Sequence, residues 1–156
     1  MERLEKSMET LVEIIREPLE NGKEVALTIR GNSMWPLLRS GRDKIFLKKL
    51  DFYKKYDIIL YRRNSGCYVL HRIVGKKNGA FILAGDGEYK TEYPIYAEQI
   101  IAGAVRVIRK KRLFLCSDFS YRLYSVMWTF LLPIRPIIVR TFALIRRRVK
   151  NVFKRK

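Results

Sequence analysis

Charged and apolar side chains alternate with helical spacing through the first 20 residues. The apolar positions on this repeat are Leu4, Met8, Leu11, Val12, Ile15 and Leu19. Such spacing places the apolar side chains on one face of a helix. It predicts an amphipathic helix over residues 3–17, ended by Pro18 and by a turn at Asn21-Gly22.

After this turn the period of the pattern becomes strand-like. Residues 24–30 alternate, with Val25, Leu27 and Ile29 on one face. Further strand signals follow at residues 44–48, 58–62, 68–74, 80–83 and 100–108, and Gly, Asn, Asp or Lys pairs separate most of them. This succession of short strands and tight turns predicts a small, mainly β domain.

The last third of the chain has a different pattern. Residues 123–134 are apolar and uncharged, but this stretch is shorter than the roughly 20 residues of a membrane-spanning helix, and Pro133 and Pro136 interrupt it. We therefore expect basic amphipathic helices that lie in a membrane interface, with Tyr124, Trp128 and Phe130 as anchors. The alternative is that this segment packs on its own domain or on a partner subunit.

Charge supports this division of the chain. The 156 residues carry 33 Lys and Arg against 15 Asp and Glu, a formal net charge of +18, and residues 106–156 hold 15 of the bases but one acid. We expect a helix over residues 1–22, a β domain over 23–110 and a basic helical tail over 111–156. Such a tail favours an anionic membrane surface as its partner. Cys67 and Cys116 are too few for a disulfide framework.

Three polar residues are candidates for chemistry. Ser33 lies in a Gly- and Pro-flanked turn after the first strand signal, where neighbouring N–H groups can form an oxyanion hole. A serine nucleophile needs a base, and the chain has one histidine, His71. Asp86, in Gly85-Asp86-Gly87, could orient that histidine. Taken singly, each has a structural explanation: a turn-capping serine, a buried histidine and a hairpin turn.

Five motifs occur in order between residues 24 and 108. They are Ser33-Met34-Trp35-Pro36, Gly41-Arg42-Asp43, Asp57-Ile58-Ile59-Leu60-Tyr61, His71-Arg72-Ile73-Val74 and Gly85-Asp86. In this order they resemble the Ser-Met-x-Pro box and the later motifs of the signal peptidase I family, with one residue inserted in the first Gly-Asp element. The resemblance implies the β-fold that this family shares with LexA-type self-cleaving repressors.

The resemblance also assigns roles. His71 occupies the place where bacterial members carry a catalytic lysine, which is similar to the endoplasmic-reticulum and sporulation-type branch. It implies Ser33 as the nucleophile, His71 as the general base and Asp86 as the orienting carboxylate, with Asp43 as the second acidic candidate. Substrate-binding positions are expected at Gly31, Met34, Trp35 and Pro36, and the N–H of Ser33 is expected to bind the oxyanion. Such a site needs no metal or cofactor.

The sequence thus predicts a serine endopeptidase that cleaves leader or signal peptides at a membrane surface. The first residues have no apolar stretch of a secretory signal, so we expect the cytoplasmic face. A first alternative is a non-catalytic, signal-peptidase-like module that binds peptides at the membrane. A second is a nucleic-acid binder, suggested by a pI of 10.2. The 23 residues before the first strand are too few for a helix-turn-helix module, and the basic tail interleaves apolar residues, so nucleic acid is not the expected partner.

Overall fold

The computed structural model describes residues 2–138 and 141, with side chains from residue 10 onward. Its elements, in chain order, are α1 (Glu2–Glu20), β1 (Val25–Thr28), β2 (Lys44–Lys48), β3 (Ile58–Arg62), β4 (Tyr68–Lys77), β5 (Ala80–Ala84), β6 (Glu92–Ile95), the 3-10 helix η1 (Ala97–Gln99), β7 (Ile100–Arg109), β8 (Arg112–Leu115), α2 (Phe119–Phe130) and the 3-10 helix η2 (Leu132–Ile134). The mainly β prediction is confirmed.

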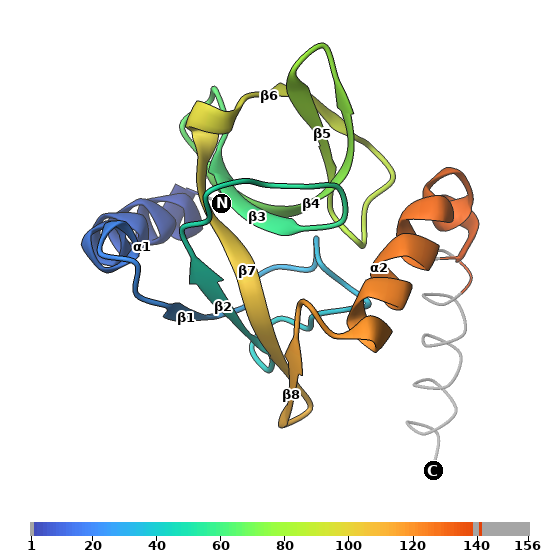
Figure 1. Cartoon of the computed structure of the whole chain (residues 1–156), viewed down its shortest axis with the longest axis horizontal. Coiled ribbons are helices and arrows are strands. Elements are labelled where there is room, and N and C mark those ends of the chain that lie inside the picture. Colours follow the sequence, from blue (N-terminus) through green and yellow to red (C-terminus); the bar gives the residue numbers. More distant parts are fainter. Residues whose placement is uncertain (1, 139–140, 142–156) are drawn as a thin grey trace.

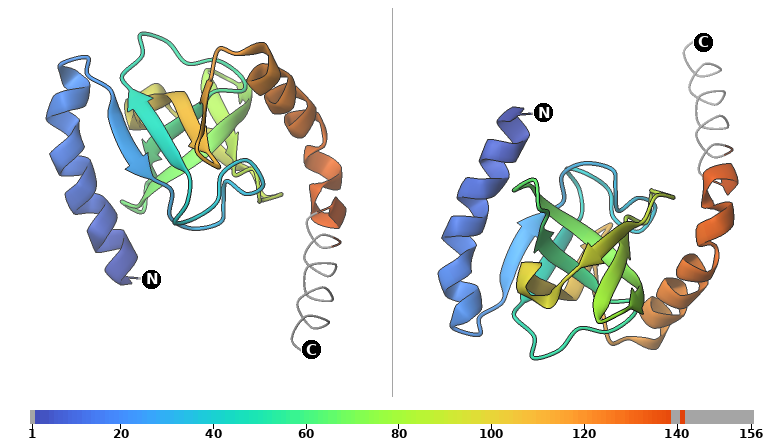
Figure 2. Two further views of the ribbon diagram at one scale, coloured as in Figure 1. Left: turned by 90° about the horizontal axis from the view of Figure 1, so that it is seen from below. Right: turned by 90° about the horizontal axis from the view of Figure 1, so that it is seen from above.

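All eight strands belong to one antiparallel sheet. Their order is β1-β2-β7-β3-β4-β5-β6, and β8 pairs with β7. Figure 1 shows α1 and α2 on opposite sides of these strands, and both views of Figure 2 agree. The strands thus form the centre of the molecule, and the two helices cover different parts of it.

The apolar alternation of each strand divides the core into two clusters. The larger cluster contains Val12, Ile15 and Leu19 of α1, together with Ile58 and Leu60 of β3. The smaller one contains the intervening β3 residues Ile59 and Tyr61, packed with Ile73, Phe81, Leu83 and Ile95. Because successive side chains of a strand point to opposite faces, β3 is buried on both faces and forms the boundary between the clusters.

The first helix extends further than its sequence pattern predicted. It continues through Pro18 to Glu20, so the expected end at residue 17 is wrong. The N–H groups of Gly22 and Lys23 donate to the carbonyls of Leu19 and Pro18, and Gly22 has a φ of 70°. This is a Schellman motif, in which a glycine in left-handed conformation ends the helix. Proline is accommodated in the last turn, whereas the predicted turn at Asn21-Gly22 is confirmed.

Two strands were not expected from the sequence. β6 contains Pro94, which cannot donate to a strand ladder, and it pairs with β5 at only two positions. β8 forms a hairpin with β7 and is mostly exposed, so its side chains do not alternate as in a half-buried strand. The segment expected to form a helical tail from residue 111 therefore begins as part of the sheet.

The helix that follows β8 packs on the β domain along one face. Tyr121, Ser125 and Thr129 of α2 are buried, as is Arg135 just after η2. The break in the helix between α2 and η2 lies at the predicted position, with Pro133 inside η2. Among the described residues, no helix combines the length and apolar character needed to cross a membrane. Residues 139–140 and 142–156 of the predicted tail lie outside the described residues.

Candidate functional site

Ser33 lies in the turn-rich segment between β1 and β2. Gly31, with a φ of 79°, introduces this segment, and the N–H of Trp35 donates to the carbonyl of Asn32. Met34 is 2% exposed and belongs to the larger core cluster. Burial of Met34 therefore anchors the turn, while Ser33 is partly exposed.

The loop after β5 lies directly against this turn. The N–H of Gly87 donates to the carbonyl oxygen of Ser33 at 2.7 Å. A Cβ at Gly85 would lie 2.5 Å from the same oxygen and 3.2 Å from Nε2 of His71. A Cβ at Gly87 would lie 2.7 Å from the carbonyl oxygen of Asn32. Both positions need glycine because two stretches of backbone approach each other there, and this approach brings Ser33 to the histidine ring.

His71 lies on β4, where it pairs with Ile59 of β3 and is 1% exposed. Its Nδ1 is 3.2 Å from the hydroxyl of Tyr61 and 3.2 Å from Oε1 of Glu92. Its Nε2 has no hydrogen-bond partner among the described residues and is 3.5 Å from Oε2 of Glu88. One ring nitrogen is therefore held by the protein, and the other has no hydrogen-bond partner and lies near Gly85 and Glu88.

Glu92, the first residue of β6, organises the side of the site around Nδ1. Both of its oxygens accept hydrogen bonds from the guanidinium of Arg63, one of them at 2.8 Å. Partial burial alone raises the pKa of Glu92, but hydrogen bonds from His71, Arg63 and Tyr61 outweigh it and hold the pKa well below its usual range. Burial, with the Glu92 carboxylate nearby, raises the pKa of Tyr61 far above its ordinary value. Glu92 is thus ionised and Tyr61 neutral across the physiological range.

Asp86 does not take the place expected for it. Its carboxylate is fully buried and accepts two hydrogen bonds from Arg72, at 2.8 and 2.7 Å. The remaining Arg72 donor reaches Ser125 of α2 and the carbonyl of Tyr56. Among the described residues, the carboxylate at Nδ1 of His71 is that of Glu92, so the orienting role that the resemblance implied for Asp86 is corrected.

Asp43, the second acidic candidate, also contacts residues that stabilise the fold and not His71. It is fully buried, and it accepts hydrogen bonds from the N–H groups of Arg39 and Lys110 and from the guanidinium of Arg42. Burial raises its pKa, but these hydrogen bonds outweigh that effect and lower it below the usual range. Asp43 joins the end of the Ser33 segment to the β7–β8 hairpin. The inserted Arg42 is its ion-pair partner.

The expected substrate-binding residues separate into two groups. Gly31 is exposed and Trp35 and Pro36 are half-buried, so all three remain accessible beside Ser33. Met34 is a core residue and cannot contact a substrate, which corrects the prediction for that position. The N–H of Ser33 donates to no acceptor within residues 10–138, as an oxyanion-binding donor requires. No hydrogen bond joins the Ser33 hydroxyl to His71 in the same described range.

The face of α2 that packs on the domain contacts the loop of residues 85–88. Trp128 Nε1 donates to the carbonyl of Asp86 at 2.9 Å, and the Tyr124 hydroxyl lies 3.5 Å from the Asp86 carboxylate. Arg135 donates to the carbonyl of Gly85 at 3.0 Å. Tyr124 and Trp128 are therefore engaged within the protein and only partly exposed. Phe130, the third expected anchor, is 85% exposed.

One group of side chains in the site could coordinate a cation. Ligand atoms of His71, Glu88 and Glu92 lie within 4.8 Å of one another. Glu92, however, is already engaged by Arg63 on both oxygens, and its partner nitrogen on His71 is Nδ1, whereas Glu88 approaches Nε2. The two carboxylates thus approach the imidazole ring at different nitrogens. The arrangement fits a histidine held between two carboxylates better than a metal centre.

Glu92, Tyr61, Arg72 and Arg135 were not anticipated as members of the site. Tyr61 could have been identified, because the antiparallel pairing of residues 58–62 with 68–72 places it close to His71 across the two strands. Glu92 gave no signal, since its strand is short, contains a proline and was not predicted. Comparisons with protein-family models and with curated protein sequences give no match to this chain.

Proposed function

We propose that this protein is a serine endopeptidase of the signal-peptidase type, in which Ser33 is the nucleophile and His71 its general base. The observation that carries the proposal is the approach of Ser33 and His71 at Gly85, with a carboxylate on the far side of the histidine ring. The Ser33 backbone and Nε2 of His71 both lie within 3.2 Å of the position that a Gly85 Cβ would occupy, and Nδ1 of His71 faces Glu92 at 3.2 Å.

The tautomer of His71 follows from its partners. A hydrogen on Nδ1 is donated to the ionised carboxylate of Glu92, which in turn accepts from Tyr61. Nε2 then keeps its lone pair and points to the Ser33 turn, as a general base requires. Contacts between a nucleophile and its base are often loose before substrate binds, so the proposal requires this hydrogen bond to form when substrate binds.

The reaction proceeds by acyl transfer. His71 Nε2 takes the proton of the Ser33 hydroxyl as Oγ attacks the scissile carbonyl carbon, and the N–H of Ser33 donates to the resulting oxyanion. The imidazolium lies between Glu92 at Nδ1 and Glu88 at Nε2, and both carboxylates stabilise its charge. It returns the proton to the leaving amine, whose bond to the carbonyl carbon breaks. Water, deprotonated by the same nitrogen, then hydrolyses the acyl ester and regenerates Ser33.

The substrate class comes from the resemblance and the surface of the molecule. We infer leader or signal peptides that are cut at an anionic membrane surface on its cytoplasmic side. Residues 106–156 carry the large excess of bases that favours anionic headgroups. Exposed apolar side chains of α2, among them Phe119 and Phe130, favour contact with the interface. The mainly β architecture is compatible with a signal-peptidase-like fold.

Cleavage profiling tests the proposal. A diverse peptide library is incubated with the full chain and anionic vesicles, and products are identified by mass spectrometry for wild type, Ser33→Ala, His71→Ala and a control, Ser40→Ala, which changes an exposed serine outside the site. We expect cleavage by wild type and the control alone. Cleavage that survives Ser33→Ala contradicts the proposal, and retention of peptides without cleavage by folded wild type favours the peptide-binding module instead.

A further inference from the structure

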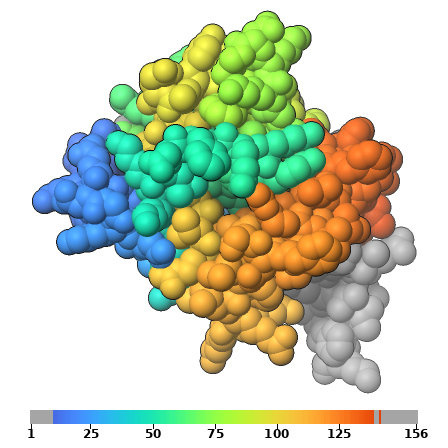
Figure 3. Space-filling view, in the orientation of Figure 1, coloured from blue at the N-terminus to red at the C-terminus, as the bar shows by residue number. Residues whose placement is uncertain are grey.

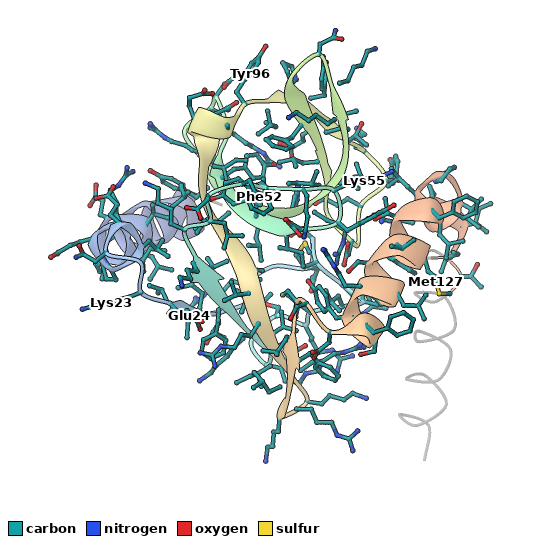
Figure 4. All side chains as sticks on the ribbon, in the orientation of Figure 1. Lys23, Glu24, Phe52, Lys55, Tyr96 and Met127 are labelled. Carbon is teal, nitrogen blue, oxygen red and sulfur yellow. The ribbon has the colours of Figure 1, made fainter. Side chains whose placement is uncertain are left out.

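One face of α2 and η2 is apolar and exposed along its whole length. Phe119 and Phe130 are 81% and 85% exposed, and Met127, on the side of α2 away from the sheet in Figure 4, is 56% exposed. Among the described residues, the exposed apolar side chains of α2, η2 and the residues just after η2 are Phe119, Leu123, Val126, Met127, Phe130, Ile134 and Ile137. Their spacing of three or four residues places them on one stripe. Figure 3 shows α2, in orange, at the outside of the molecule. Exposed apolar stripes of this size mark interaction sites.

The charge of the chain identifies the occupant of this face. Residues 106–156 carry 15 basic residues and one acid, Asp118. A second copy of the chain docked through the same face would bring two strongly positive segments together, which repel each other. An anionic bilayer satisfies both features, since its acyl chains accept the apolar stripe and its headgroups attract the bases.

The opposite face of α2 and η2 contacts the loop of residues 85–88, which lies beside His71. Arg135 donates to the carbonyls of Gly85 and, at 3.4 Å, Glu88, and Trp128 donates to the carbonyl of Asp86. This loop carries the Glu88 carboxylate to His71 and donates from Gly87 to Ser33. Contacts from α2 and from Arg135 therefore hold this loop against the site.

Some polar groups that are buried where this segment packs on the domain lack full hydrogen-bond or charge partners. Arg135 is fully buried, but its described hydrogen-bond partners are carbonyl oxygens and not a carboxylate. The hydroxyl of Thr129 is buried without a partner in the described residues. The Asp86 carboxylate attracts Arg135 but is hydrogen-bonded to Arg72. Burial of the Arg135 charge and of the unpaired Thr129 hydroxyl therefore opposes docking of the helix. A ligand that favours the docked arrangement can then shift the population toward it.

We propose that the exposed apolar face of α2 and η2 docks on an anionic bilayer, and that this docking closes the loop of residues 85–88 on Ser33 and His71 through Trp128 and Arg135. The bilayer is then an activator of the site as well as its location. This inference rests on the proposed peptidase for its functional meaning, while the coupling between bilayer and loop is a property of the fold that can be measured without catalysis.

The test uses the full chain with Ser33→Ala, so that no cleavage enters the measurement. Amide hydrogen exchange of residues 85–88 is followed in buffer, with phosphatidylcholine vesicles and with vesicles that also contain phosphatidylglycerol, and co-sedimentation measures binding. The N–H of Gly87 reports directly on the loop, since it donates to Ser33. We expect phosphatidylglycerol vesicles to slow exchange about tenfold, which corresponds to a typical coupling between sites.

Three variants test which residues are needed for vesicle binding and for the slower exchange of residues 85–88. The double variant Phe119→Ser/Phe130→Ser is expected to lose vesicle binding and the slowing, whereas Phe52→Ser, a change at a phenylalanine that is 71% exposed elsewhere, keeps both. Trp128→Phe keeps an aromatic side chain but removes the N–H that donates to the carbonyl of Asp86, so this variant is expected to bind vesicles with less slowing of exchange.

Four results overturn the proposal. They are binding without slowing in the parent chain, equal slowing by phosphatidylcholine alone, slowing that persists in the double variant, and self-association of the chain through these phenylalanines in place of vesicle binding. The last result assigns the face to a second copy. Failure of the peptidase itself is seen separately, as absence of cleavage by wild type, and leaves the exchange result unchanged.

Discussion

Oε1 of Glu92 lies 3.2 Å from Nδ1 of His71, while Nε2 of the same ring lies 3.2 Å from the position that a Gly85 Cβ would occupy, beside the Ser33 carbonyl. A carboxylate at one ring nitrogen fixes the hydrogen there and leaves the other nitrogen as the acceptor. This relationship joins a residue of a short, unpredicted strand to the histidine of the central sheet, and in the proposed mechanism it sets the direction of proton transfer.

Replacement of Glu92 by Gln is expected to reduce peptide cleavage by a factor of about 10²–10⁴, because a neutral amide neither fixes the tautomer nor stabilises the imidazolium. Cleavage rates of Glu92→Gln and of Glu98→Gln, a change at an exposed control position, provide the measurement. The role assigned to Glu92 is wrong if both variants retain the wild-type rate.

Loss of Glu92 should also change stability in a pH-dependent way. The pKa of Glu92 is lower in the folded protein than its ordinary value of 4.5, so its ionised form stabilises the fold above pH 4.5 and this contribution is lost as pH falls. The difference in unfolding free energy between wild type and Glu92→Gln is expected to be largest near pH 7 and to shrink toward pH 3. Chemical denaturation at several pH values measures it, and a difference that grows as pH falls contradicts the assignment.

Arg72→Met is expected to destabilise the protein by about 3–5 kcal/mol, because it leaves the fully buried carboxylate of Asp86 without its partner. The double variant Arg72→Met/Asp86→Leu removes both charges and should recover part of this loss. Denaturant titration of the three proteins gives the comparison. If the double variant is less stable than Arg72→Met, the two residues do not act as a compensating pair.

Gly85→Ala is expected to impair both folding and cleavage, since its Cβ would lie 2.5 Å from the Ser33 carbonyl oxygen and 3.2 Å from His71 Nε2. Gly75→Ala is the matched control, because its Cβ would meet Ile82 at an ordinary 3.4 Å. We expect cleavage to fall for Gly85→Ala alone, measured as kcat/KM with folding checked by thermal unfolding. Full activity of Gly85→Ala would show that the loop does not press on the site as described.

The strand alternation predicted much of this molecule, and its exceptions have physical causes. Residues 44–48 and 58–62 are strands with the predicted bounds, since branched and aromatic side chains dominate them. β6 was missed because Pro94 interrupts the pattern of a strand. The helix end was predicted too early because a proline such as Pro18 usually breaks a helix. In the structure Pro18 lies in the last turn of the helix, and the hydrogen bonds of Gly22 and Lys23 close that turn. A proline in the sequence does not reveal this cap.

The candidate site also contains residues that the sequence predicted and residues that it did not. Ser33 and His71 were expected on sequence grounds, and the structure brings their segments together at Gly85. The carboxylates could not be assigned in the same way, because the choice between Asp86 and Glu92 depends on where Arg72 and Arg63 place their guanidinium groups. Such pairings arise from contacts between residues 14 and 29 positions apart, and local patterns do not encode them.

The most direct test of the central claim is a double-mutant cycle on kcat for peptide cleavage, with wild type, Ser33→Ala, His71→Ala and the double variant. Residues that act as one catalytic unit show strongly non-additive losses. We expect each single variant to lose a factor of at least about 10³, and the double variant to lose no more than either one. Losses that multiply, or a rate that survives the change of Ser33, would contradict a nucleophile activated by His71.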